Sequence, residues 1–205
     1  QLLEQIGRAK NKYKFTVVGG GAGAWQWNRY DDPTAAGILD VIYEGYFEGA
    51  GPGLFRDILD GKTVPPYVCC DKTCAEGIRP IRSASLMGIV ELSRGCGRGC
   101  KFCTIAAKKI EHLPPDIILS DLQTNVAGGV CSAVSGSEDF FRYGAQGVRP
   151  EFEKLRGLLE QMRQIRGLSF MQLDHANISS VAQMTDEQLQ ERSEERRVGK
   201  ECRSR

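Results

Sequence analysis

The sequence predicts an α/β fold with parallel βαβ units, and two patterns support this prediction. Short runs of β-branched and aromatic residues end at glycine-rich turns, and stretches with helical periodicity follow them. Strands that alternate with helices at this spacing are typical of parallel sheets covered by helices. With 41% hydrophobic and 26% charged residues among 205, the composition is that of an ordinary globular chain and excludes collagen-like, mucin-like and wholly disordered proteins.

The first predicted domain covers residues 1–65. Its predicted elements are a helix over residues 1–10, strands over residues 14–18 and 40–43, and a helix over residues 53–59. The second helix is indicated by four apolar residues that share one face, namely Leu54, Phe55, Ile58 and Leu59. Pro65 and Pro66 close the domain, and residues 66–85 show no clear period, so we expect a connector there.

The second predicted domain covers residues 86–191 and continues the alternation. Its predicted elements are strands over residues 89–92, 130–134 and 168–173 and helices over residues 115–126 and 151–165. Pro114 and Pro115 suit the start of the first of these helices, where a missing N–H costs nothing. Thr185 and Gln188 have the spacing of a capping box, which predicts that a third helix begins there.

The last fourteen residues, 192–205, are predicted to be foreign to the domain. They read RSEERRVGKECRSR, lack apolar periodicity and resemble the translation of a common sequencing adapter. A solvated basic tail is the alternative. We therefore set the segment aside and expect Cys202 to carry no chemistry. We expect the chain to be a fragment that is open at both ends and is inactive by itself.

Composition also limits the classes of partner. No stretch approaches the roughly 20 apolar residues that span a bilayer, and a formal net charge of +1 gives no basic face that would recruit nucleic acid. Three of the eight cysteines lie within residues 96–103, which suits a metal site better than a disulfide framework. Together with the lack of a signal peptide, this predicts a reducing, cytoplasmic compartment, no membrane partner and no sign of nucleic-acid binding.

One motif carries most of the chemical information. Residues 93–103 read SRGCGRGCKFC and place CxxxCxxC directly after a predicted strand. Cys96, Cys100 and Cys103 can converge from one short loop because the glycines between them let the backbone turn tightly. Three thiolates fit three irons of a four-iron, four-sulfur (4Fe–4S) cluster and leave the fourth iron open. A zinc site is the alternative, and it normally needs a fourth ligand, for which the candidates are Cys74, Cys131 and His112.

This motif, with Phe102 just before its third cysteine, resembles that of the radical S-adenosylmethionine superfamily. The resemblance implies a (β/α)6 partial TIM barrel, of which residues 86–191 would be the first half. It also implies that Cys96, Cys100 and Cys103 ligate the cluster, and that S-adenosylmethionine chelates the open iron with Phe102 near its adenine. One electron from the reduced cluster then cleaves the sulfonium, and the resulting 5′-deoxyadenosyl radical abstracts hydrogen from a substrate.

Members of this superfamily commonly place a glycine-glycine-glutamate segment after the second strand to bind the methionine amino group. Here residues 135–139 read SGSED, so Ser137 and Glu138 occupy the equivalent place without paired glycines. The resemblance implies that these two residues contact the cofactor, and a helix-capping acidic turn is the alternative. His175 and Asn177 follow the third strand, at the end of the barrel where active-site groups collect, although a structural role is the simpler interpretation of a lone histidine.

Residues 17–25 and 40–45 resemble the second half of the cobalamin-binding Rossmann-like domain that precedes the barrel in one large subgroup of radical enzymes. The resemblance implies that the turn formed by Gly19, Gly20 and Gly21 packs against the nucleotide tail of cobalamin. A purely structural α/β domain is an equal alternative. The spacing also fits a dinucleotide loop loosely, but polar residues and a proline interrupt the helix that should follow, so nicotinamide binding ranks low.

The leading function prediction is a cytoplasmic radical S-adenosylmethionine enzyme with a 4Fe–4S cluster, in which cobalamin-dependent methyl or methylthio transfer is one of the reactions considered. The expected partners are an unidentified substrate and a reductant such as flavodoxin or ferredoxin. No catalytic residue is assigned beyond the cofactor ligands. The rival prediction is a non-catalytic module that binds an iron–sulfur cluster or zinc, or that transfers electrons.

Overall fold

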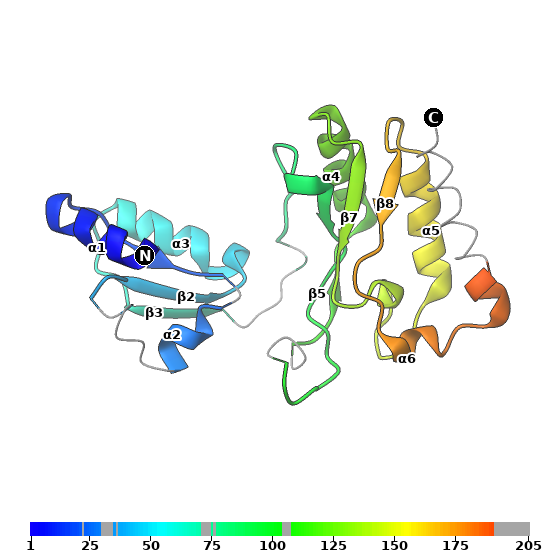
Figure 1. Ribbon diagram of the computed structural model, residues 1–205, viewed down its shortest axis with the longest axis horizontal. Coiled ribbons are helices and arrows are strands. Elements are labelled where there is room, and N and C mark those ends of the chain that lie inside the picture. The colour runs from blue at the N-terminus through cyan, green and yellow to red at the C-terminus, as the bar shows by residue number, and fades with distance from the viewer. Residues whose placement is uncertain are drawn as a thin grey trace. The chain divides into compact units, whose positions relative to one another are not determined.

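The chain forms two compact α/β units, Gln1–Gly77 and Ile78–Arg205 (Figure 1). The computed structural model describes residues 1–21, 23–29, 35, 37–70, 75, 77–103 and 108–190. Both units contain a parallel three-stranded sheet with helices packed on it, so the predicted α/β class is confirmed. No helix in the described part of the chain is long and apolar enough to cross a membrane.

Unit 1 has the sheet order β1–β2–β3. Its described elements are α1 (Leu2–Lys12), β1 (Val18–Gly19), α2 (Trp25–Arg29), β2 (Val41–Gly45), α3 (Phe47–Leu59) and β3 (Tyr67–Cys70). The core of this unit forms where Val41 and Tyr43 of β2 pack on Leu54 of α3, and α2 lies on the other face of the sheet (Figure 1). The strand predicted over residues 40–43 is present as β2, whereas the strand predicted over residues 14–18 shares only Val18 with β1.

The connector predicted over residues 66–85 begins instead with β3, which pairs in parallel with β2. Val68 and Cys70 contact the core of unit 1, while the Tyr67 hydroxyl donates a hydrogen bond to the Glu44 carboxylate. The strand shows no clear period because it is four residues long and two of them are adjacent cysteines. Tertiary pairing, rather than a local pattern, makes this segment a strand.

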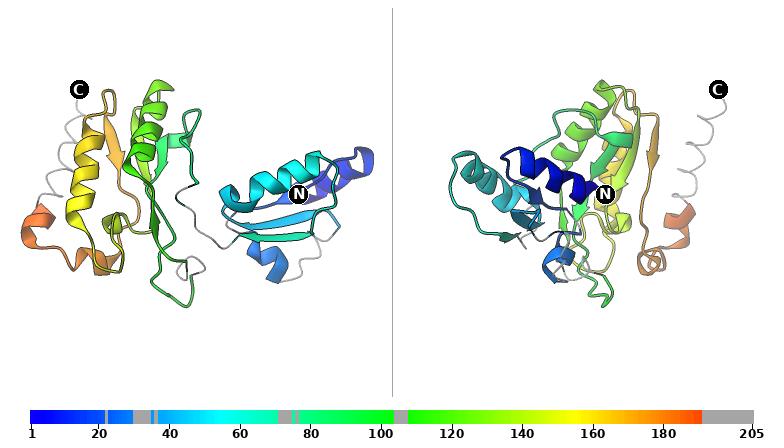
Figure 2. Two further views of the ribbon diagram at one scale, coloured as in Figure 1. Left: turned by 180° about the vertical axis from the view of Figure 1, so that it is seen from behind. Right: turned by 60° about the vertical axis from the view of Figure 1, so that its left-hand side comes forward.

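Unit 2 has the sheet order β4–β7–β8, with all neighbouring strands parallel. Its elements are η1 (Leu86–Gly88), β4 (Ile89–Glu91), β5 (Ser93–Arg94), β6 (Glu111–His112), α4 (Pro115–Ala127), β7 (Ser132–Gly136), η2 (Phe140–Arg142), α5 (Phe152–Arg163), β8 (Phe170–Gln172) and α6 (Ile178–Val181). Helices α4 and α5 follow β4 and β7 and pack on the same side of the sheet (Figures 1 and 2).

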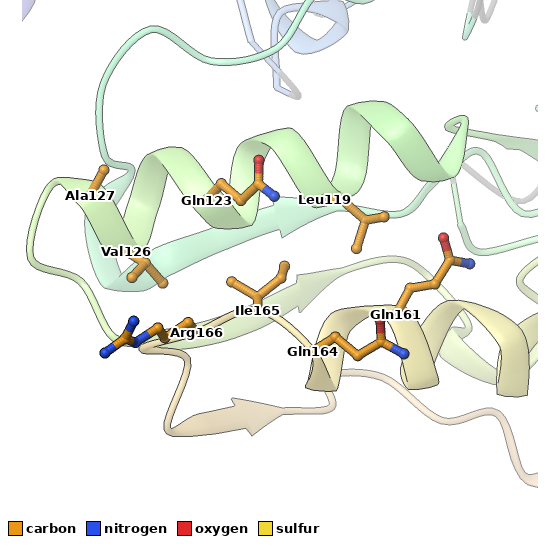
Figure 3. A pocket seen from close by; sticks show the side chains of 8 residues that line it. All are labelled: Leu119, Gln123, Val126, Ala127, Gln161, Gln164, Ile165 and Arg166. Atoms are coloured by element: carbon orange, nitrogen blue, oxygen red, sulfur yellow. The ribbon is translucent and has the colours of Figure 1, made fainter.

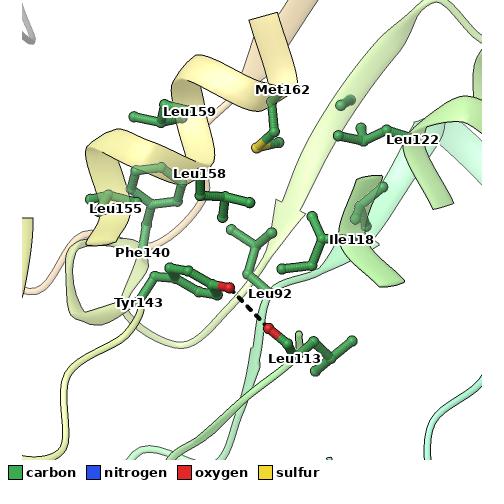
Figure 4. Close-up of a cluster of buried hydrophobic side chains, with 12 residues drawn as sticks. Leu92, Leu113, Ile118, Leu122, Phe140, Tyr143, Leu155, Leu158, Leu159 and Met162 are labelled. Atoms are coloured by element: carbon green, nitrogen blue, oxygen red, sulfur yellow. Dashed lines mark hydrogen bonds between the residues drawn. The ribbon is translucent and has the colours of Figure 1, made fainter. Parts of the chain in front are cut away.

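The core of unit 2 joins the sheet to these two helices (Figure 4). Ile118 and Leu122 of α4 and Leu155 and Leu158 of α5 are all at most 1% exposed, as expected for apolar residues that recur at helical spacing. Tyr143 lies in the same cluster, and its hydroxyl donates a hydrogen bond of 2.9 Å to the Leu113 carbonyl oxygen. This bond supplies the partner that a buried hydroxyl needs.

Two local features of unit 2 bear on the predictions. Thr185 and Gln188 form the expected reciprocal capping box, with the Thr185 N–H donating to Gln188 Oε1 at 2.9 Å and the Gln188 N–H donating to Thr185 Oγ1 at 3.3 Å. An unpredicted two-stranded antiparallel pair, β5 and β6, stands between β4 and α4. Each of its strands has only two residues, which is too short for alternation to appear in the sequence.

Candidate metal centre

The cysteine motif lies in the loop that joins β5 to β6. The strand pair closes the base of the loop through the register Ser93↔His112 and Arg94↔Glu111, and the Cys96 N–H donates to the Lys108 carbonyl oxygen at 3.0 Å. The loop therefore starts and ends on a hydrogen-bonded hairpin. Residues 104–107 lie outside the described part of the chain.

Glycine is required in this loop by the backbone. Gly95, Gly97 and Gly99 have φ values of +72°, +68° and +68°, a region that other residues rarely adopt. A Cβ at Gly95 would also lie 2.3 Å from the Lys109 carbonyl oxygen. The three glycines therefore provide tight backbone turns next to Cys96 and Cys100.

The three thiols of the motif are free, with Cys100 exposed and Cys96 and Cys103 half-buried. The Cys103 N–H donates to the Cys100 carbonyl oxygen at 3.1 Å, so the last two cysteines share a tight turn. Among the described residues, no group of three or more His, Cys, Asp or Glu side chains is gathered closely enough to hold a metal ion. The predicted convergence of the three thiols is therefore not present in the structure. The donor set has the chemistry that iron–sulfur clusters and zinc prefer, and ligation by these thiols stays a prediction.

The cysteine loop lies at the same sheet edge as two other predicted site segments. Because β4, β7 and β8 are parallel, the segments that follow their carboxyl ends meet at one edge. The Phe140 N–H, after β7, donates to the His175 carbonyl oxygen, after β8, at 3.0 Å. Ligand sites of open α/β sheets form at this edge, so the topology brings the predicted site segments of unit 2 together.

A buried ion pair holds the cysteine loop against the other two segments. Arg98, between the first two cysteines, donates through Nη2 to Asp139 Oδ2 at 2.7 Å, and the two side chains are 12% and 1% exposed. The same Nη2 also donates to Ser180 Oγ, and Nη1 donates to Ser179 Oγ. Ser180 Oγ in turn donates to Asp139 at 2.7 Å. Arg98 therefore ties the motif to the loop after β7 and to α6.

A second buried arginine binds the backbone of the motif itself. Arg142 of η2 is 2% exposed, and its Nη1 donates to the Cys96 carbonyl oxygen at 2.6 Å. Its Nε and Nη2 both donate to the Gly147 carbonyl oxygen, at 2.9 and 2.7 Å. The guanidinium thus joins the first cysteine of the motif to the loop that precedes α5.

His112 is not available as a zinc ligand. Its Nε2 lies 2.7 Å from the Ala145 carbonyl oxygen, which only accepts, so Nε2 carries the proton and Nδ1 accepts from Ser93 Oγ at 2.9 Å. Burial, and then the charge of Arg142, lower the pKa of His112. Because both ring nitrogens are engaged, neither presents a lone pair to a metal.

Of the other two candidates for a fourth zinc ligand, only Cys131 lies among the described residues. Cys131 directly precedes β7, so it belongs to the sheet edge opposite the cysteine loop, and Cys74 lies outside the described residues. The zinc alternative therefore has no fourth ligand among the described candidates.

The predicted contacts for S-adenosylmethionine differ in their environment. Ser137 is buried, and its Oγ accepts a hydrogen bond of 3.3 Å from the Asp139 N–H, whereas Glu138 and Phe102 are exposed, Phe102 by 92%. Asp139 precedes η2 without a side-chain capping bond, so the described segment lacks the acidic cap that was the alternative. The carboxylate of Glu138 is exposed, and its role in binding the cofactor stays a prediction.

The residues predicted after the third strand have local roles. Asn177 caps α6, because its Oδ1 accepts from the Ser179 N–H at 3.0 Å. His175 is exposed and has a positive φ of 42°. Its Phe140 contact uses the main-chain carbonyl rather than the imidazole.

The glycine turn of unit 1 divides into a packed and an open part. A Cβ at Gly19 would lie 2.7 Å from Trp27 Cζ3 and 2.8 Å from Leu39 Cδ1, so side-chain packing explains glycine there. Gly20 lies near the Tyr43 backbone, whereas Gly21 has a φ of +98° and open space where a Cβ would be. Packing accounts for Gly19 without a ligand, and cobalamin binding stays a prediction.

The sequence analysis assigned no role to three residues of the site, namely Arg98, Asp139 and Arg142. Arg98 stands inside the motif and Asp139 directly follows Glu138, so both are near predicted positions. Buried charges in a globular chain are normally paired or hydrogen bonded. The burial that marks these residues is a tertiary property, and no local pattern signals it.

A pocket of about 580 Å³ lies between α4 and α5, away from this edge (Figure 3). Leu119, Val126 and Ile165 contribute apolar surface, and its polar side chains are three glutamines and Arg166. Most of its lining comes from the carboxyl-terminal halves of the helices, which run back toward the amino-terminal edge of the sheet. It offers neither a nucleophile nor a general base.

No protein-family model matches the chain, and a search of curated proteins finds no match.

Proposed function

We propose that the chain is a radical S-adenosylmethionine enzyme in which Cys96, Cys100 and Cys103 hold a 4Fe–4S cluster. The observation that supports this most is the position of the glycine-rich cysteine loop, which lies at the carboxyl edge of a parallel sheet. It is hydrogen bonded there to the loop after β7 and to α6. When bound, the cluster supplies the electron that cleaves S-adenosylmethionine into methionine and a 5′-deoxyadenosyl radical.

The residues around the loop have separate tasks in this proposal. Arg98 and Asp139 hold the motif at the sheet edge through their buried ion pair. Glu138, exposed at the same edge, binds the methionine ammonium through a charge-assisted hydrogen bond. Phe102, also exposed, stacks beside the adenine. The substrate is unidentified, and cobalamin-dependent methyl or methylthio transfer is the proposed reaction class.

The cluster is tested first. The full chain is reconstituted anaerobically with iron and sulfide, and iron, sulfide and iron–sulfur absorbance are measured for the wild type and for Cys96→Ala, Cys100→Ala and Cys103→Ala. Each variant is expected to lose the cluster. Cys131→Ala is the matched control, since this free, exposed cysteine lies outside the motif, and it is expected to keep the cluster. A full cluster in Cys100→Ala would contradict the assignment.

Enzyme activity is tested separately. Reconstituted protein of full length is incubated with S-adenosylmethionine and dithionite, and release of 5′-deoxyadenosine is measured. A protein that binds a cluster but neither binds S-adenosylmethionine nor releases the nucleoside would be an electron-transfer module. Zinc in place of iron in the protein as purified would favour the zinc module.

Glu138 is tested by affinity rather than by activity. Glu138→Gln is expected to weaken binding of S-adenosylmethionine and to leave the iron content unchanged, because the residue is not a ligand. Glu153→Gln, an exposed change in α5, is the control and should bind as the wild type does. Equal affinities in both variants would remove Glu138 from the cofactor site.

Cobalamin binding by unit 1 is a further part of the proposal. Gly21 supports it, because its φ of +98° and the open space beside it leave room for a ligand at the turn. Titration with hydroxocobalamin is expected to change the cobalamin absorbance spectrum, and Gly21→Val to weaken that change. A wild type without any spectral change would favour the purely structural domain.

A further inference from the structure

Cys100 and Cys103 form the two ends of one hydrogen-bonded β-turn. The Cys103 N–H donates to the Cys100 carbonyl oxygen at 3.1 Å, and Lys101 and Phe102 are the two turn residues between them. The Cα atoms at the ends of such a turn lie less than about 7 Å apart. Because disulfides join Cα atoms that are about 4.4–6.8 Å apart, the backbone holds these two cysteines at a separation that a disulfide bridges.

Both thiols of this turn are free, with Cys100 exposed and Cys103 half-buried. Lys101 and Phe102 are exposed as well, Phe102 by 92%, so a small molecule in solution has access to the turn. A disulfide needs two sulfurs, whereas a metal ion needs three or more ligands, and no such group is gathered among the described residues. The geometry of the loop therefore suits chemistry between two thiols.

Cys96 is held in a different way. Its N–H donates to the Lys108 carbonyl oxygen at 3.0 Å, and its carbonyl oxygen accepts from Arg142 Nη1 at 2.6 Å. Both peptide groups are thus fixed at the base of the hairpin. Within the described part of the chain, no backbone hydrogen bond joins Cys96 to another cysteine, so the turn selects Cys100 and Cys103 as the pair.

We propose that Cys100 and Cys103 are a reversible dithiol–disulfide couple that exchanges with low-molecular-weight disulfides of the glutathione class. The exposed Cys100 thiolate attacks one sulfur of the external disulfide, whose S–S bond breaks and releases the first thiol. The Cys103 thiolate then attacks Cys100 Sγ, forms the internal disulfide and releases the second thiol. The two protons of the cysteines end on the two released thiols. The chain loses two electrons and the external disulfide gains them.

This inference does not rest on the proposed function, because it needs only the two thiols of the turn. It has one consequence for the proposed enzyme. A disulfide between Cys100 and Cys103 withholds two of its three cluster ligands, so the loop takes up a cluster only when the couple is reduced.

The first test identifies which cysteines pair. The reduced full chain is treated with oxidised glutathione, the remaining thiols are alkylated, and the tryptic peptides are analysed by mass spectrometry. Trypsin cuts after Arg94, Arg98, Lys101 and Lys108, so the three cysteines of the motif fall in separate peptides, residues 95–98, 99–101 and 102–108. Peptides 99–101 and 102–108 are expected to be recovered joined by a disulfide. A mixture of pairings without excess of this one would overturn the inference.

The second test separates the folded turn from mere closeness in sequence. The ratio of disulfide to dithiol is measured at equilibrium in one glutathione buffer, with and without concentrated urea. The ratio is expected to be roughly tenfold or more higher in the folded chain, because the turn has already ordered the backbone of the two residues between the thiols. Equal ratios would overturn the role of the turn.

Variants test the two steps of the exchange. Cys103→Ser is expected to keep glutathione bound to Cys100, because no second thiol displaces it, whereas Cys100→Ser is expected to lose the joined peptides. Cys131→Ser is the matched control, since Cys131 is free and exposed outside the motif, and it should pair as the wild type does. A wild type that keeps as much glutathione on Cys100 as Cys103→Ser does would contradict the proposal.

The outcomes for the couple and for the proposed enzyme are distinguishable. A chain that forms this disulfide but takes up no cluster after reduction and reconstitution supports the couple and overturns the proposed function. A chain that takes up a cluster, but forms only glutathione adducts once the metal is removed, overturns the couple and leaves the proposed function standing.

Discussion

Replacing Asp139 by Asn is expected to destabilise unit 2 more than any exposed charge change. The substitution keeps the shape of the side chain but removes the charge that faces Arg98, and these two side chains are 1% and 12% exposed. The guanidinium then remains buried without a counter-ion. The partners Ser180 and Asn177 also lose a charged acceptor.

The size of the effect follows from the burial of the pair. At an effective dielectric constant of about 20, unit charges about 4 Å apart attract each other by roughly 4 kcal/mol, and removal of one partner of a buried pair costs roughly 3–5 kcal/mol. With a urea m-value of about 2 kcal/mol per M, a loss of about 4 kcal/mol lowers the unfolding midpoint by roughly 2 M. The ion pair between Arg156 and Glu153 is exposed. Its removal should cost much less, because exposed pairs contribute only about 0.2–1 kcal/mol to stability.

The assay is urea unfolding of the full chain with two probes. Both tryptophans, Trp25 and Trp27, lie in unit 1, so their fluorescence reports on that unit while far-ultraviolet circular dichroism reports on both. The unfolding of unit 2 is the part of the dichroism change that has no counterpart in fluorescence. Asp139→Asn should lower the urea midpoint of this part and leave the fluorescence midpoint, which reports on unit 1, unchanged. Glu153→Gln is the control. A midpoint in Asp139→Asn that falls no further than in this control would refute the reasoning.

Three further changes are expected to have measurable effects on stability. Burial raises the pKa of Asp121 above its ordinary value of 3.8. The protonated carboxyl therefore stabilises the folded wild type below pH 3.8, and this stabilisation is lost as the pH rises through the raised pKa. Asp121→Asn should remove this pH dependence and stabilise unit 2 at neutral pH. Tyr143→Phe should cost about 1–3 kcal/mol by leaving the Leu113 carbonyl oxygen without its donor, and the cost should not vary near neutral pH because burial raises the pKa of Tyr143 to about 12. Gly45→Ala should destabilise unit 1 by more than about 1 kcal/mol, since Gly45 has a φ of +109° and a Cβ would lie 2.0 Å from the Cys70 carbonyl oxygen.

Each of these has a matched comparison. Gly53→Ala, inside α3 with nothing within 4 Å of the added Cβ, should leave unit 1 unchanged or slightly more stable, and a loss equal to that of Gly45→Ala would contradict the steric argument. Tyr13→Phe, at a side chain that is 59% exposed, should have no effect. An Asp121→Asn variant that keeps the wild-type pH dependence would show that another group causes it.

Local sequence patterns determined where several helices begin and which glycines adopt left-handed conformations. The capping box of Thr185 and Gln188 forms as its spacing predicts, and α4 begins at Pro115 as expected from its apolar period and its proline. The glycines of the cysteine motif adopt the left-handed conformation that residues with a Cβ rarely adopt. All of these depend on neighbours a few residues apart, which a sequence displays directly.

The tertiary structure decided what lies around the motif. Arg98 pairs with Asp139 across 41 residues, and Arg142 reaches the Cys96 carbonyl oxygen across 46. These contacts span α4 and β7, so they exist only because the parallel strands β4 and β7 bring their carboxyl ends to one edge. For the same reason β3 could not be foreseen, since Tyr67–Cys70 becomes a strand through its pairing with β2. Burial and long-range pairing follow from how the sheet assembles, and they give the charges near the cysteines their physical effect.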